Sequence, residues 1–165
     1  MSWDVTLQVP GVEWASTDWN YTHNTNPMIV EAMERAGIEF EFVPGSNRHR
    51  SRVERVEAGH LCFRRGPDHQ PGDELVPVQC SLDPSCCDLG WGDVFDGRPG
   101  PDGCRILEAV VEQWDADPQH FIAMDPPNGW GSLLPKGDGC GLRAVFVDMI
   151  EHARTEAPLV WTYSG

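Results

Sequence analysis

The sequence predicts a small α+β fold in which about three or four helices pack on a short antiparallel sheet. Residues 3–9 and 159–163 alternate apolar and polar side chains, which is the period of half-buried strands. Residues 26–37, 106–114 and 139–156 instead repeat apolar side chains every three or four positions, as amphipathic helices do. We expect the N- and C-terminal strands to pair and the helices to cover the sheet.

A dense polar segment at residues 18–26 is expected to be a loop that opens the first helix. Asn26 suits the N-cap, and Pro27 suits the first helical position because its missing N–H has no intrahelical partner there. Gly37 is expected to end the helix. Free backbone N–H groups at a helix N-terminus favour an anion or a polar ligand, so the segment is a candidate binding site.

Weaker patterns predict further elements. Residues 38–43 alternate like a strand, residues 51–58 fit a short helix with Val53 and Val56 inward, and residues 74–80 fit a weak strand. Asp117 is expected to cap a second short helix that runs to Met124.

We expect one domain over residues 1–165, with residues 60–104 as an irregular insertion within it. That stretch holds five of the six cysteines, is rich in glycine and proline, and lacks clear periodicity.

The formal net charge of −14 opposes general binding to nucleic acids or to anionic membranes, because phosphates would be repelled. No stretch approaches the roughly 18 apolar residues that span a bilayer, and no secretion signal is evident, so we expect a cytoplasmic protein. The acidity leaves open a protein that masks a basic partner surface. Exposed tryptophans near the loops would allow a homodimer, although no heptad or apolar edge specifies one.

Two motifs resemble a family of small uncharacterised proteins of bacteria, notably actinobacteria, and their phages. They are Asn20-Tyr21-Thr22-His23-Asn24, with Pro27-Met28 after it, and Asp125-Pro126-Pro127-Asn128-Gly129-Trp130-Gly131. The similarity covers about the first 37 and the last 65 residues and omits the middle. It implies a loop before a first helix, an Asn-Gly-Trp-Gly turn before a last helix, and one site formed by both. No activity is established for the family, but a phage setting suggests sequestration of a host signal.

The paired loops hold residues that suit a nucleotide-like ligand. Asparagines both donate and accept hydrogen bonds, aromatic faces stack on planar rings, and arginines offer paired donors to phosphates. The opposing interpretation is that the asparagines satisfy loop backbone while the aromatic rings fill the core. Glycines on both sides of Trp91 and Trp130 leave the same choice open. The candidate ligand-binding residues are Tyr21, Thr22, His23, Asn24, Asn26, Arg48, Arg50, Arg52, Asn128 and Trp130.

A metal site is a weaker hypothesis. The middle segment supplies the side-chain types that zinc prefers, but the spacing departs from paired Cys-x2-Cys motifs, so ordinary thiols are favoured and no cofactor is expected. An acidic cluster for a divalent cation is similarly open, although such residues are usually just solvated. The candidates are His60, Cys62, His69, Cys80, Cys86 and Cys87 for zinc, and Asp83, Asp88, Asp93 and Asp96 for a divalent cation.

The sequence lacks the common catalytic signatures, including the nucleophile elbow, the phosphate-binding loop, the dinucleotide fingerprint and His-Glu-x-x-His. We therefore expect a non-enzymatic binding protein for a small polar, nucleotide-like ligand. The alternatives are an acidic interaction protein and a metal-dependent hydrolase built on the middle segment.

Overall fold

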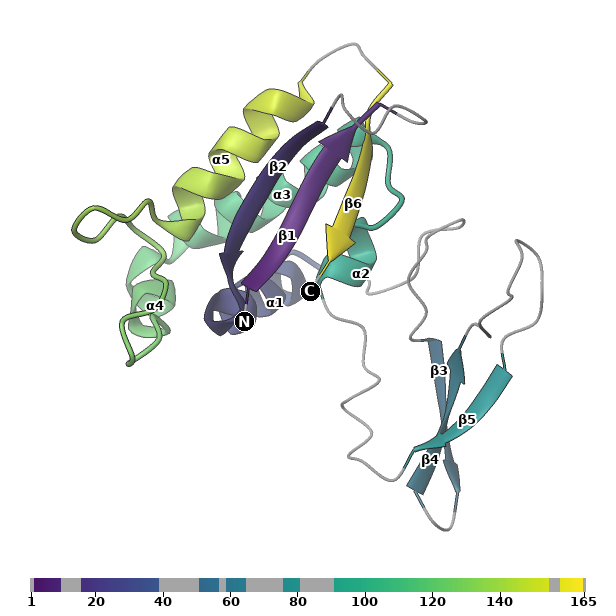
Figure 1. The fold of residues 1–165 in the computed structure, drawn as a ribbon. Helices are drawn as coiled ribbons and strands as arrows, with labels where there is room; N and C mark the ends of the chain where they lie inside the picture. The colour runs from purple at the N-terminus through teal and green to yellow at the C-terminus, as the bar shows by residue number, and fades with distance from the viewer. Residues whose placement is uncertain are drawn as a thin grey trace.

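The computed structural model describes residues 2–9, 16–38, 51–56, 59–64, 76–80, 91–154 and 158–164. It confirms an α+β fold with an antiparallel sheet that joins the N- and C-terminal strands. In this sheet β1 (Ser2–Gln8) lies between β2 (Ser16–Thr22) and β6 (Val160–Ser164). The helices pack behind the sheet, and the pairing of β1 with β6 places segments from opposite ends of the chain side by side (Figure 1).

The helices follow the apolar spacing of the sequence. The stripes expected at residues 106–114 and 139–156 lie in α3 and α5, and the helix expected after Asp117 is α4. Helix α2 was not predicted, because five residues are too few to show a helical period. The helices are α1 (Asn26–Arg35), α2 (Trp91–Phe95), α3 (Gly100–Ala116), α4 (Pro118–Ala123) and α5 (Leu142–Ala153), with the 3-10 helix η1 (His23–Thr25) before α1.

A second three-stranded antiparallel sheet consists of β3 (Ser51–Val56), β4 (Gly59–Arg64) and β5 (Val76–Cys80), in that order. The strand expected at residues 74–80 is confirmed as β5. The helix expected at residues 51–58 is wrong, because pairing with β4 satisfies the backbone of β3 and overrides a weak helical spacing. The middle stretch therefore contains more regular structure than its composition predicts.

Two expectations about the first helix need correction. The polar segment expected as a loop is strand from Asp18 to Thr22, because the backbone of β2 pairs with β1 there, and the 3-10 helix η1 follows. Thr25, and not Asn26, is the residue that precedes α1, and its hydroxyl donates to the Thr22 carbonyl at 2.8 Å instead of capping the helix. Gly37 follows the helix with a φ of 71°, as expected for a glycine at this position. Residues 39–43 of the strand expected at 38–43 lie outside the described residues.

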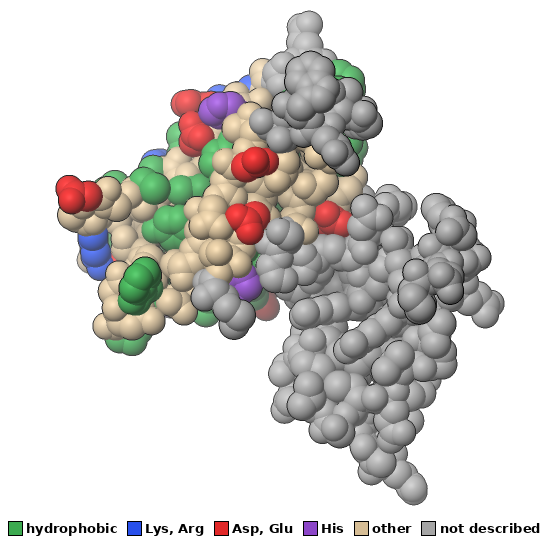
Figure 2. All heavy atoms as spheres, viewed as in Figure 1, with side chains coloured by type: hydrophobic (Ala, Val, Ile, Leu, Met, Phe, Trp, Pro, Cys, Tyr) green, Lys and Arg blue, Asp and Glu red, His purple; other side chains and the backbone are tan. Residues whose placement is uncertain are grey.

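The core lies between the first sheet and the helices. Along β1, Trp3, Val5 and Leu7 are buried, while Ser2 and Asp4 alternate with them on the exposed face. The outward face is polar, with separate acidic side chains over it (Figure 2). This alternation is why one side of the sheet packs on helices and the other meets solvent.

Buried tryptophans dominate this core, and most of their indole N–H groups are paired. Trp91 is 1% exposed, so the interpretation that its ring fills the core is correct. Indole donors reach two helix side chains and two helix carbonyls: Trp19 to Asp148 Oδ2 at 2.7 Å, Trp91 to Asn26 Oδ1 at 3.1 Å, Trp114 to the Met28 carbonyl at 3.3 Å, and Trp161 to the Gly100 carbonyl at 3.1 Å.

Helix α3 approaches β6 closely at Gly103. A Cβ at this position would overlap the indole ring of Trp161, whereas a Cβ at Gly100 would lie 3.4 Å from Leu159 Cβ, an ordinary contact. The missing side chain at Gly103 therefore sets the distance between helix and strand.

Gly103→Ala should lower the free energy of unfolding by about 1–3 kcal/mol, because the core must shift to admit the methyl group. Gly100→Ala is the matched control, since it makes the same change in the same helix and should cost less than about 0.5 kcal/mol. Urea denaturation followed by circular dichroism measures both. Equal stability of the two variants would show that the Trp161 ring can move aside without lowering the free energy of unfolding.

Candidate functional site

The candidate site begins where β2 ends and α1 starts. The Thr22 hydroxyl accepts a hydrogen bond from the Asn24 backbone N–H at 3.3 Å, which turns the chain into η1. Thr25 is fully buried beneath this turn. The local bonds fix the backbone and leave the Asn24 side chain exposed.

The turn before α5 forms the opposite side of the site. The Asp125 carboxylate accepts from the Leu133 N–H at 2.8 Å and pairs with Lys136 Nζ at 2.5 Å. Asn128 Oδ1 accepts from the Trp130 N–H at 3.0 Å, the local bond that asparagine commonly makes in turns. These contacts hold the turn and project the Trp130 side chain outward.

Close packing joins the turn to β2. Gly131 has a φ of 92°, and a Cβ there would lie 2.5 Å from Thr22 Cγ2 and 2.8 Å from Thr25 Cγ2. Any other residue would therefore be strained and would also push the turn away from the strand. The two motifs are adjacent in space although more than 100 residues separate them in the chain.

The Tyr21 hydroxyl fastens the same junction. Its oxygen lies 3.1 Å from the carbonyl oxygens of Ser132 and Cys140, either of which can accept its proton, and it accepts from the Ser132 N–H at 3.3 Å. The Tyr21 ring lies 6.0 Å from that of Trp3. Burial is the main reason that the pKa of Tyr21 is raised above its ordinary value.

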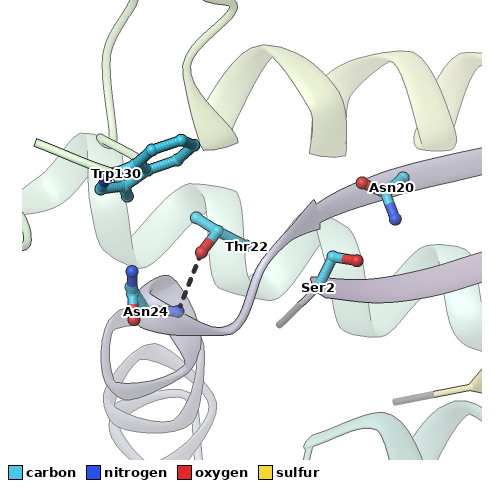
Figure 3. A pocket seen from close by; sticks show the side chains of 5 residues that line it. All are labelled: Ser2, Asn20, Thr22, Asn24 and Trp130. Atoms are coloured by element: carbon cyan, nitrogen blue, oxygen red, sulfur yellow. Dashed lines mark hydrogen bonds between the residues drawn. The ribbon is translucent and has the colours of Figure 1, made fainter.

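A pocket of about 560 Å³ lies between the strand and the turn. Figure 3 shows the Trp130 indole on one side, Thr22 and Asn24 below it, and Ser2 and Asn20 on the neighbouring strands. Trp130 is 71% exposed, so for this tryptophan the interpretation of a core plug is wrong. The lining residues are Ser2, Asn20, Thr22, Asn24 and Trp130, none of which is charged at neutral pH.

Three expected site residues have structural contacts instead of lining the pocket. Tyr21 is engaged with the turn backbone, Asn26 accepts from Trp91, and Asn128 holds the turn. His23 lies in η1, and its buried Nε2 has no hydrogen-bond partner among the described residues. The structure thus brings Thr22, Asn24 and Trp130 to the pocket, while Tyr21, Asn26 and Asn128 make contacts within the fold.

Ser2 and Asn20 were not among the expected site residues. The register pairs Ser2 with Thr22 and Asp4 with Asn20, so a two-residue period along β2 places Asn20 and Thr22 on one face. Asn20 Nδ2 donates to Asp4 Oδ1 at 2.6 Å, which orients its amide. Treating residues 16–22 as a strand is what reveals this pair.

The basic and metal-binding candidates fall largely outside the described part of the chain. The candidates outside the described residues are Arg48, Arg50, His69, Cys86 and Cys87. Arg52 is in β3, His60 and Cys62 are in β4, and Cys80 is in β5, where the register pairs it with His60. The side chains of these strand residues are not described.

Among the described residues, no group of three or more His, Cys, Asp or Glu side chains is placed to hold a metal ion. Asp96, a candidate for the acidic cluster, is buried, and its Oδ1 accepts from the Tyr163 N–H at 3.1 Å. Asp83 and Asp88 lie outside the described residues, as does the side chain of Asp93. The helices in the described ranges include none that is long and apolar enough to cross a membrane.

Comparison of the chain with protein-family models, with curated proteins and with solved structures gives no match. The resemblance to small bacterial and phage proteins therefore stays a prediction.

Tyr21→Phe should lower the free energy of unfolding by about 1–3 kcal/mol near neutral pH, because the buried Ser132 N–H loses its acceptor. The neutral phenol is favoured in the folded protein, so its contribution is complete below the ordinary pKa of about 10 and is lost as the pH rises through the higher folded pKa. The stability difference between wild type and variant should therefore shrink in alkali. Urea denaturation at about pH 8 and about pH 10.5 measures it. A difference that grows with pH would contradict this account.

Proposed function

We propose that the protein binds a small polar ligand with a planar ring, of the nucleotide-like class, in the pocket between β2 and the turn at residues 125–131. The single observation that carries the proposal is the Trp130 indole, held 71% exposed beside a pocket lined by hydrogen-bonding side chains. Its chemistry is that of a binding site, because an aromatic face stacks on a planar ring while amides and hydroxyls pair with the ring edge.

Several contacts hold the turn so that the Trp130 side chain lies exposed beside the pocket, and they support this proposal. Asp125, Asn128 and Gly131 fix the turn on both sides of the tryptophan, yet the ring itself packs on little. All the other tryptophans among the described residues are buried in the core, in contrast to Trp130. A rigid turn with an exposed ring is the arrangement that stacking requires, because the ring need not be reordered when the ligand binds.

The side chains that line the pocket also limit the chemical class of ligand that it can bind. Asn20, Asn24, Thr22 and Ser2 offer both donors and acceptors without formal charge, which suits the edge of a neutral heterocycle such as a nucleobase. Phosphates on such a ligand would require cations, and none lines the pocket in the described residues. We further propose that the arginines at residues 48–52 supply those cations. We also propose that the protein sequesters a host signal in a phage setting.

The first experiment is native mass spectrometry of the purified protein, followed by denaturation and identification of the released molecules. A nucleoside or nucleotide at one per chain supports the proposal. A protein that carries none is then titrated by calorimetry with the four nucleosides and their mono- and triphosphates. Absence of binding across that panel, together with an empty native spectrum, would contradict the proposal.

Trp130→Ala should weaken binding of the ligand found in this way by about 10- to 100-fold, since stacking of a base on an aromatic ring is worth about 1–3 kcal/mol. Because the ring is exposed, the variant should unfold at the same urea concentration as wild type. Leu134→Ala is the control, since Leu134 is the other large exposed apolar residue described and does not line the pocket. Unchanged affinity in Trp130→Ala would remove the pocket from consideration.

Asn24→Ala should weaken binding less, by about 3- to 10-fold, because one hydrogen bond is worth about 0.5–1.5 kcal/mol. The substitution keeps the Asn24 backbone N–H that bonds Thr22, so the turn itself is retained. Calorimetry with the same ligand measures the effect. Full affinity in this variant would show that the amide does not contact the ligand.

A further inference from the structure

A second hollow, separate from the pocket at Trp130, lies on the seam between α3 and α5. It has a volume of about 440 Å³ and shares no lining residue with the first pocket. The two helices pack along their length, and Figure 1 shows them side by side behind the sheet. We call this hollow the seam groove; its lining residues are Glu108, Val111, Glu112, Val147, Ile150, Glu151 and Arg154.

Two interhelical ion pairs bound the seam. Arg154 Nη2 lies 2.8 Å from Glu108 Oε1 at one end, and Arg143 binds both oxygens of Asp115, at 2.6 and 2.8 Å, toward the other. The Arg143 guanidinium lowers the pKa of the Asp115 carboxyl, consistent with a close pair. These exposed pairs bridge the two helices on either side of the groove, while packing of their buried apolar side chains holds the helices together.

The groove combines an aliphatic floor with an acidic rim. Val111 and Ile150 are 9% and 6% exposed, and Val147 between them is half-buried. Glu112 on α3 and Glu151 on α5 are exposed on opposite sides, and neither has an ion-pair partner within the described ranges. Three glutamates against one arginine leave the lining negative, on a chain of net charge −14.

We propose that the seam groove binds a basic segment of a protein partner, whose lysine or arginine side chains lie along the floor with their charged ends between Glu112 and Glu151. Such side chains have long aliphatic stems and a cationic head, and they match a groove that is apolar below and acidic above. Nucleic acid would be repelled by this rim, and no metal-binding cluster is present here among the described residues. This surface is independent of the ligand pocket.

The test uses fluorescence anisotropy of a labelled synthetic peptide with lysine or arginine beside leucine at helical spacing. The full-length protein should bind it, and binding should weaken steeply as salt rises. A peptide of the same composition in scrambled order should bind at least about fivefold more weakly, because it cannot place stems and charges together. Equal binding of the two peptides, or no binding of either, overturns the proposal.

The Glu112→Gln/Glu151→Gln double variant should lose about 2- to 30-fold in affinity, because it removes both carboxylates that would face the cationic ends of the peptide. Glu34→Gln/Asp138→Asn is the matched control, because it removes two exposed carboxylates that do not line the groove. Circular dichroism checks that both variants are folded. An equal loss in the two double variants would mean general attraction to an acidic chain and would overturn the proposal.

A substitution of opposite sign gives a stricter test. Arg154→Gln removes the one cation of the lining and should strengthen peptide binding by about threefold, whereas Lys136→Gln removes a cation from the turn outside the groove and should leave it nearly unchanged. Unfolding of Arg154→Gln would weaken binding, so a gain in affinity cannot arise from damage to the fold. Equal affinities of the two variants would overturn the proposal.

Discussion

The structure depends on one constraint: large indole rings are buried, and each brings an N–H group that is costly to leave without a partner. Four of the five buried rings have one, and Trp3 Nε1 has none among the described residues. A buried unpaired donor costs about 1–3 kcal/mol, whereas the ring itself is among the largest sources of apolar burial. Trp19 joins β2 to α5, Trp91 joins α2 to α1, Trp114 joins α3 to α1, and Trp161 joins β6 to α3. The indole bonds therefore fix which elements are neighbours, while the apolar stripes fix only which face is inward.

The candidate site is a consequence of that framework. Asn26 begins α1 and accepts from Trp91, so the helix that follows the polar segment is tied directly to the core. Tyr21 reaches from β2 to the turn, and Gly131 permits the turn to lie against Thr22. Tyr21 and Asn26, which were expected to contact a ligand, thus make contacts that support the site. The exposed surface of the pocket is formed by Trp130 and the neighbouring face of β2.

The parts of the fold that could be predicted are those in which periodicity and burial agree. The stripe of α3, from Ile106 to Trp114, and that of α5 are long enough to show a helical period, and β1 alternates cleanly. Strand β2 was missed because serine, threonine, asparagine and aspartate are typical of turns, although Trp19 and Tyr21 alternate as a strand requires. The sequence motifs contain Thr22, Asn24 and Trp130, which line one pocket in the structure. They could not separate pocket-lining residues from supporting ones, since that depends on partners such as Ser132, 111 positions away.

The contact between Tyr21 and Ser132 also has a consequence for synthesis and turnover. A ribosome-bound chain that ends before residue 125 has β2 and α1 but neither the Trp130 indole nor the Ser132 and Cys140 carbonyl groups that fasten Tyr21. Contacts of such long sequence separation form late, because closing the loop costs entropy before any contact compensates for it. The pocket between β2 and the turn is therefore complete only after the segment that holds Trp130 and Ser132 has been added to the chain. Any molecule held there would protect the junction of β2 with the turn at residues 125–131 from local opening, and so from proteases, more strongly as its concentration rises.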